Sequence, residues 1–121
     1  MSTGQNVSSD SLRAGVAIAQ FIFVAQSTTA DATAVLPAAG GAVVGISTLD
    51  AAAGGDVPVQ LLGWQKVTVG ASNITRGAIV ASDNTGKATT ATSGQVGVGI
   101  AKESGTAGGL MTIWLQCQGK Q

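Results

Sequence analysis

The same short pattern occurs twice in this chain, 54 residues apart. Each copy has a Val-Gly-Ile run, seven further residues, a Gly-Gly pair, and then apolar residues at alternate positions. The copies begin at Val44 and Val98, and their glycine pairs are Gly54-Gly55 and Gly108-Gly109. We interpret the pattern as one β-hairpin used twice, at 42–63 and 96–117, because two copies are too few for a solenoid. The alternative is chance similarity in a chain rich in Gly, Ala and Val.

Short runs rich in Val, Ile and Thr, bounded by Gly, Asp, Asn and Ser, follow one another along the chain. Such runs are typical of β-strands, and alternation such as Val57, Val59 and Leu61 turns one face of a strand toward a core. No window shows helical periodicity, so the fold class is predicted to be all-β, a small β-barrel or β-sandwich. Strands are expected at 16–24, 42–47, 57–62, 65–69, 77–81, 87–91, 95–101 and 110–117.

The beginning of the chain is rich in Ser, Thr, Gly, Asn and Gln, with Val7 and Leu12 interspersed. Such a stretch buries too little apolar surface to offset its ordering entropy, so it is expected to need a partner surface to adopt a fixed structure. We therefore divide the chain into an extended N-terminal arm, residues 1–14, and a single β-domain, residues 15–121.

The most apolar stretch, residues 15–25, is too short to cross a bilayer, which requires about 20 apolar residues. A secretory signal is the alternative to a buried strand here. Against it, the residues before Arg13 include Asp10 and no basic side chain. The buried strand is favoured, and no membrane partner is expected.

The composition argues against most catalytic and metal chemistry. The chain has no His, the commonest metal ligand and acid–base residue near neutral pH, and a single Cys, Cys117. Its Gly-rich loops lack the spacing for dinucleotide or phosphate binding, and its carboxylates are isolated in the sequence. Six Lys and Arg balance six Asp and Glu, and this zero net charge argues against a nucleic-acid partner. We expect no enzymatic activity, no cofactor and no metal site.

The two Trp residues of the chain are candidate partner contacts. Trp114 is flanked by Ile113 and Leu115, so it is expected on the face of its strand opposite the core, and Trp64 follows Gly63 at a strand junction. Trp is enriched in the buried centres of protein interfaces. The alternative is that either ring packs on the domain's own loops.

Several segments between about residues 35 and 117 occur in an order that is more specific than any one of them. They are the two Val-Gly-Ile hairpins, Gly63-Trp64, Asn73-Ile74-Thr75-Arg76-Gly77-Ala78-Ile79-Val80, the turn Asp83-Asn84-Thr85-Gly86-Lys87, the run Gln95-Val96-Gly97-Val98-Gly99-Ile100-Ala101, and a final apolar strand. In this order the chain resembles the small capsid decoration, or cement, proteins of tailed bacteriophages.

The resemblance implies a small β-barrel or sandwich that binds the outer surface of the assembled head and stabilises the capsid lattice, usually as a homotrimer. Its partners would be the lattice of the major capsid protein and further copies of itself. The resemblance also implies that the protein is made in the host cytoplasm. The resemblance also implies that an N-terminal arm contacts the shell, which makes Val7, Leu12 and Arg13 further candidate contacts. The sequence of the arm matches no family motif.

Two alternatives stay open. One is an adhesion or head-fibre-base β-domain, which would have aromatic and polar clusters at its loop tips. The other is an enzyme or prosthetic-group carrier barrel, which needs a Lys in a recognisable setting at a hairpin tip. Lys87 and Lys102 lie near turns but lack that setting.

Overall fold

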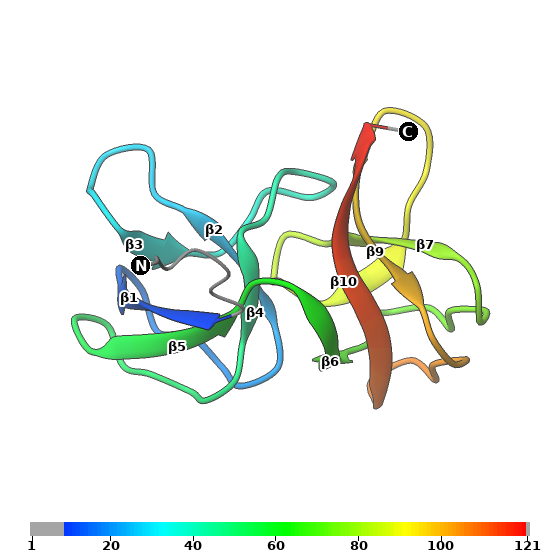
Figure 1. The fold of residues 1–121 in the computed structure, drawn as a ribbon, viewed down its shortest axis with the longest axis horizontal. Helices are drawn as coiled ribbons and strands as arrows, with labels where there is room; N and C mark the ends of the chain where they lie inside the picture. The colour runs from blue at the N-terminus through cyan, green and yellow to red at the C-terminus, as the bar shows by residue number, and fades with distance from the viewer. Residues whose placement is uncertain (1–8, 121) are drawn as a thin grey trace, which may run out of the picture.

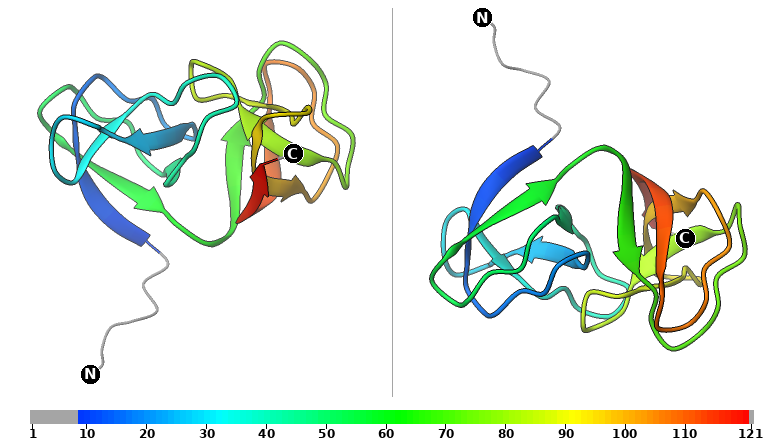
Figure 2. Two further views of the ribbon diagram at one scale, coloured as in Figure 1. Left: turned by 90° about the horizontal axis from the view of Figure 1, so that it is seen from above. Right: turned by 90° about the horizontal axis from the view of Figure 1, so that it is seen from below.

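The computed structural model describes residues 9–120, and every regular element in this range is a β-strand (Figure 1). The all-β fold class is confirmed. The strands are β1 (Ser9–Ala14), β2 (Phe23–Gln26), β3 (Thr33–Val35), β4 (Gly45–Ser47), β5 (Asp56–Gln60), β6 (Gly63–Thr68), β7 (Ile79–Ser82), β8 (Ala88–Thr90), β9 (Val96–Ala101) and β10 (Leu110–Lys120). They form two lobes side by side, β1–β5 and β6–β10 (Figures 1 and 2). Within the described range no helix is long and apolar enough to cross a membrane.

The first lobe is a closed barrel with the strand order β1-β3-β2-β4-β5. Antiparallel pairing of β1 with β5 closes it, and β1 pairs in parallel with β3 on its other side. Residues 9–14 are therefore a barrel strand, and the expected arm does not extend over them. The reason is that β1 completes the barrel core, where Leu12 packs and Ala14 is fully buried. Residues 1–8 lie outside the described residues.

The strand expected at 16–24 is wrong for most of its length, because only Phe23 and Val24 of that range lie in a strand, β2. The residues before them form a loop in which Ile18 and Ala51 exchange two backbone hydrogen bonds of 2.9 and 2.8 Å. Ile18 and Ile22 are buried in the barrel core. The apolar side chains of this stretch thus fill the core without strand geometry. β1 and β3 lie outside the strands expected from the sequence.

The second lobe is a five-stranded antiparallel sheet with the order β6-β10-β9-β7-β8. The sheet curls until its two ends approach each other. Val69, just after β6, forms a parallel bridge with Ala88 of β8, and the Gly70 N–H donates to the Ala88 carbonyl at 2.9 Å. This bridge is equivalent to the parallel pairing of β1 with β3 in the first lobe.

The two hairpins that carry the sequence repeat have the same pairing register. In the β4–β5 hairpin Ile46 lies opposite Gln60, and in the β9–β10 hairpin Ile100 lies opposite Trp114, 54 residues further along in both strands. Gly45 and Gly99 also correspond. A Cβ atom on either glycine would collide with a carbonyl oxygen of the partner strand, that of Gln60 or of Trp114. Glycine is therefore required at both positions by the close approach of the two strands.

The correspondence extends beyond the hairpins to the whole of each lobe. β1 matches β6 at an offset of 55 residues, β2 matches β7 at 56, and β3 matches β8 at 54. Matching pairs in the two lobes are Ile18–Ala51 and Ile74–Gly105, Phe23–Ile46 and Ile79–Ile100, and Ala14–Ala34 and Val69–Ala88. The chain is thus a tandem of two equivalent five-stranded units, residues 9–62 and 63–120.

The backbone conformation of the β2–β3 turn is repeated in the β7–β8 turn. Ala32 has a φ of 46°, and its equivalent, Gly86, has a φ of 82°. Only glycine adopts positive φ without steric cost, so the second unit has the favourable residue and the first carries backbone strain at Ala32.

Backbone hydrogen bonds and a shared core join the two lobes. The Phe23 N–H donates to the Gly86 carbonyl at 2.7 Å, and the Thr68 N–H donates to the Phe21 carbonyl at 2.8 Å. Phe23 and Ile46 of the first lobe belong to the same buried cluster as Val67, Val80, Met111 and Ile113 of the second. The relative position of the lobes is therefore fixed by packing as well as by chain connection.

Candidate partner-binding surface

Two Trp side chains lie directly opposite each other on the outer face of the second lobe. Trp64 of β6 and Trp114 of β10 are register partners in the antiparallel pair. Val67, Ile113 and Leu115 point inward and are buried, so the residues that alternate with them point outward. Trp64 is 57% exposed and Trp114 is 42% exposed. The expected orientation of Trp114 away from the core is thus what the structure shows.

Lys102 holds its ammonium group over both rings. Its Nζ atom lies 4.9 Å from the ring centroid of Trp64 and 4.8 Å from that of Trp114. A cation at this distance from an exposed ring contributes about 0.5–1 kcal/mol. The two rings therefore restrain the Lys102 side chain, which otherwise would move freely in solvent.

The loop that carries Lys102 is anchored to β10 beside Trp114. The Lys102 N–H donates to the Thr112 carbonyl at 3.0 Å. The Thr112 N–H in turn donates to the Oε2 atom of Glu103 at 2.8 Å. Because Thr112 is two residues from Trp114, these bonds fix the start of the loop next to the Trp pair.

Two more exposed residues share this face of the sheet. Lys66 alternates with Trp64 on β6, and Leu110, which is 51% exposed, has the same orientation as Trp114 on β10. We call these five residues, Trp64, Lys66, Lys102, Leu110 and Trp114, the Trp face. It combines large apolar side chains with two positive charges, and its Trp residues are of a type enriched at protein interfaces.

The first unit shows that the fold does not require this face. The pair equivalent to Trp64 and Trp114 is Ser9 and Gln60, which are register partners in β1 and β5. The residue equivalent to Lys102 is Thr48, whose N–H donates to the Pro58 carbonyl as that of Lys102 donates to Thr112. The same strand geometry thus forms with uncharged polar residues at these three positions. The Trp face is for that reason a candidate contact with a partner molecule.

The other residues predicted as contacts lie in the first lobe. Leu12 is half-buried against the barrel core, and Arg13 is exposed on β1 opposite Asp56 of β5. Val7 lies outside the described residues. The structure therefore brings Trp64 and Trp114 together and places Leu12 and Arg13 on a different lobe.

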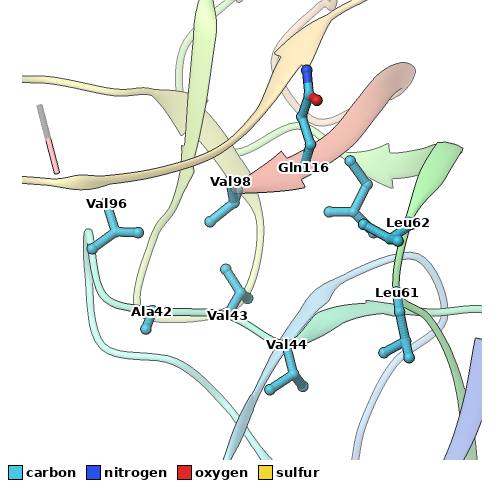
Figure 3. Close-up of a pocket in the computed structure, with 9 residues that line it drawn as sticks. Ala42, Val43, Val44, Leu61, Leu62, Val96, Val98 and Gln116 are labelled. Carbon is cyan, nitrogen blue, oxygen red and sulfur yellow. The ribbon is translucent and has the colours of Figure 1, made fainter. Parts of the chain in front are cut away.

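An apolar groove between the lobes was not expected from the sequence. It has a volume of about 180 Å³ and lies where the chain passes from β5 to β6 (Figure 3). Its lining residues are Ala42, Val43, Val44, Leu61, Leu62, Val96, Val98, Leu115 and Gln116. The only hint in the sequence is that Leu61 and Leu115 are equivalent positions of the repeat, which brings both to the same junction.

The Asp83 carboxylate, whose pKa is shifted, has a structural role. Burial raises the pKa of Asp83, but hydrogen bonds from Thr85 and Lys87 outweigh this effect and hold the pKa below its ordinary value of 3.8. Its Oδ1 atom accepts from the Thr85 N–H, the Thr85 hydroxyl and the Lys87 N–H at 2.8–2.9 Å. These bonds order the β7–β8 turn. Among the described residues no three His, Cys, Asp or Glu side chains are grouped so that they could hold a metal ion.

Comparison with known families identifies the protein class. The phage cement protein family matches residues 1–116, nearly the whole chain. The chain belongs to the phage cement protein family. The resemblance noted from the order of the sequence segments is confirmed, and the protein is a phage capsid decoration protein, a structural component of the virion.

A solved structure has the same fold. The head fiber gp8.5 N base of bacteriophage phi29 superposes with a TM-score of 0.76 at 21% sequence identity, covering 93% of this chain and 96% of that one. At this identity the similarity shows the fold. No curated protein has a matching sequence.

Proposed function

We propose that this protein binds the outer surface of the assembled phage head as a homotrimer and cements the capsid lattice. The observation that carries the proposal is the Trp face, an exposed aromatic pair held by Lys102 at a position where the equivalent unit has Ser9 and Gln60. An isolated domain has no use for such a face, whereas a trimer that caps a lattice buries it against a shell subunit or a further copy of the chain.

The N-terminal segment supplies the second contact in this proposal. Residues 1–8 lead into β1, and their Val7 is a candidate contact with the shell. An extended segment of mixed polar residues can pair its backbone with a strand of a shell subunit without needing special side chains. A trimer has three such segments, so weak individual contacts add to strong attachment through effective concentration.

Attachment of this kind stabilises the shell by mass action. A protein that binds only the assembled lattice lowers the free energy of that state relative to dissociated subunits. Catalysis has no part in this role, and a protein with zero net charge is not drawn to nucleic acid or to anionic membranes.

Co-sedimentation with expanded, undecorated shells tests the proposal. We compare the wild type with the double variant Trp64→Ser plus Trp114→Gln, which installs the residues of the first unit. Val16→Ser, which removes an apolar side chain that is 40% exposed in the first lobe, is the matched control. The wild type and the control are expected to bind at micromolar concentration, and the double variant about tenfold or more weakly. Failure of the wild type to bind contradicts the proposal.

A head-fibre base is the second candidate function, favoured by the similarity to the phi29 head fiber base over 96% of that chain. A fibre base also binds the capsid but carries a further projecting segment. Electron microscopy of decorated shells separates the two functions. Compact caps at the attachment sites support a cement protein, and fibres that extend beyond the caps in intact virions support a fibre base.

A further inference from the structure

The zero net charge of the chain conceals a separation of charge between its two units. Residues 1–62 have a net side-chain charge of −3, and residues 63–121 have a net side-chain charge of +3. The charged residues of the first part are Asp10, Arg13, Asp31, Asp50 and Asp56, and those of the second part are Lys66, Arg76, Asp83, Lys87, Lys102, Glu103 and Lys120. Because the two units share one fold, opposite charges on them are not a folding requirement.

The positive unit concentrates charge and apolar surface on the Trp face. Lys66 and Lys102 are both exposed there, and the Trp rings restrain Lys102. Glu103, the nearest acidic residue in the sequence, directs its Oε2 atom to the Thr112 N–H. The face therefore presents ammonium groups among aromatic rings and suits a partner with a carboxylate beside an apolar side chain.

The acidic unit presents that combination in the connection between β4 and β5. Leu49 is 56% exposed, as much as Trp64, and the neighbouring Asp50 is exposed as well. Thr48 anchors the start of the connection, since its N–H donates to the Pro58 carbonyl at 2.9 Å. The connection belongs to the first lobe, whereas the Trp face lies on β6 and β10 of the second (Figure 1).

We propose that the Trp face of one copy binds Leu49 and Asp50 of a second copy, with Asp50 pairing with Lys102 and Leu49 covering the Trp rings. The two surfaces are different parts of the same chain, so the contact is heterologous, and repetition of it closes a ring when the rotation between copies allows. This inference rests on the proposed function, because it names the contact that holds the copies together on the shell.

Charge reversal in the free protein tests the contact. Analytical ultracentrifugation measures self-association of the full chain at low and high salt. The emission of Trp64 and Trp114, the only Trp residues in the chain, reports directly on burial of the face. We compare the wild type, Lys102→Glu, Asp50→Lys, the double reversal, and Asp31→Lys, which makes the same charge change on another loop of the acidic unit.

The wild type and Asp31→Lys are expected to associate with a shift of Trp emission to shorter wavelength, less strongly as salt increases. Each reversal at the contact raises the dissociation constant about tenfold or more, and the double reversal restores it to within about threefold. A wild type that stays monomeric to 100-fold above its shell-binding concentration, or a double reversal no better than either single variant, overturns the inference. If one of these outcomes is found but the wild type still binds shells, the contact between copies is wrong and the proposed function is retained.

Discussion

Trp64 and Trp114 lie opposite each other on β6 and β10 in the register that Ser9 and Gln60 occupy on β1 and β5. One strand pair is thus present twice in the molecule, once with two exposed aromatic rings and once with two polar side chains. The comparison shows that the strand pair forms without the two aromatic rings, so the rings are an addition to the surface. A contribution of the Trp pair to function can therefore be measured without a large loss of stability.

The double variant Trp64→Ser plus Trp114→Gln is expected to keep the free energy of unfolding within about 1 kcal/mol of the wild type, since surface changes are usually small and the lost cation–π contacts are weak. Urea denaturation measures this value. A loss of several kcal/mol would mean that the aromatic pair has a structural role, and reduced shell binding would then not be evidence for an interface.

Gly45→Ala and Gly99→Ala are expected to destabilise the protein by similar amounts, about 1–3 kcal/mol each, because the added Cβ meets a carbonyl oxygen of the partner strand. Urea denaturation of the two variants provides the comparison. A large effect at one position and none at the other contradicts the equivalence of the two hairpins.

Ala32→Gly is expected to stabilise the protein by up to about 1 kcal/mol, because it relieves positive φ in the first unit. Gly86→Ala, the reverse change in the second unit, should be destabilising, both through φ and because the new Cβ would lie 2.6 Å from the Phe23 carbonyl oxygen. Thermal and urea unfolding measure both effects. A destabilising Ala32→Gly contradicts the assigned strain.

Asp83 makes the stability of the protein dependent on pH in the acidic range. Because its pKa is lower in the folded protein than the ordinary value of 3.8, its contribution is present above that value and is lost as pH falls through the folded pKa. Asp83→Ser installs the residue found at the equivalent position, Ser27, whose hydroxyl accepts from the Thr29 N–H at 3.1 Å. Between pH 6 and pH 3 the free energy of unfolding should decrease less in the variant than in the wild type. Equal losses contradict this role.

Two N-terminal truncations are expected to have different effects, because β1 begins at Ser9. Deletion of residues 2–8 is expected to leave the unfolding temperature unchanged and to weaken shell attachment, because the barrel begins at Ser9. Deletion of residues 2–12 removes most of the strand that pairs with both β3 and β5, so the barrel should lose its cooperative unfolding. Calorimetry and co-sedimentation measure the two effects. If the shorter deletion leaves attachment unchanged, the N-terminal segment has no part in binding.

The strands with clear alternation could be predicted from the sequence, whereas β1 and β3 could not. Apolar residues at alternate positions, such as Val57 and Val59 or Met111 and Ile113, indicate which face of a strand points to the core. The sequence of β1 indicates an arm because only two of its side chains, Leu12 and Ala14, are apolar, and its strand conformation depends on pairing with two neighbours. The sequence indicates the tandem organisation only in the hairpins, because differences of one or two residues in loop length change the offset from 54 to 55 in β1 and to 56 in β2.

The candidate site was predicted in part. The alternation of Ile113, Trp114 and Leu115 predicts that Trp114 points away from the core, which the structure shows. For Trp64 the sequence indicates only a strand junction. The sequence does not predict that Lys102 lies above the two Trp rings, because its place there depends on how the β9–β10 loop folds back against Thr112. The zero net charge likewise conceals two oppositely charged units, because a total charge carries no information about position.

The most direct test of the central claim is the temperature at which expanded phage shells break apart, measured by light scattering with and without the protein at saturating concentration. A cement protein that binds the lattice should raise this temperature, and Trp64→Ser plus Trp114→Gln at the same concentration should raise it much less. An unchanged temperature in shells that sedimentation shows to be fully decorated by the wild type would contradict the claim that this protein cements the capsid.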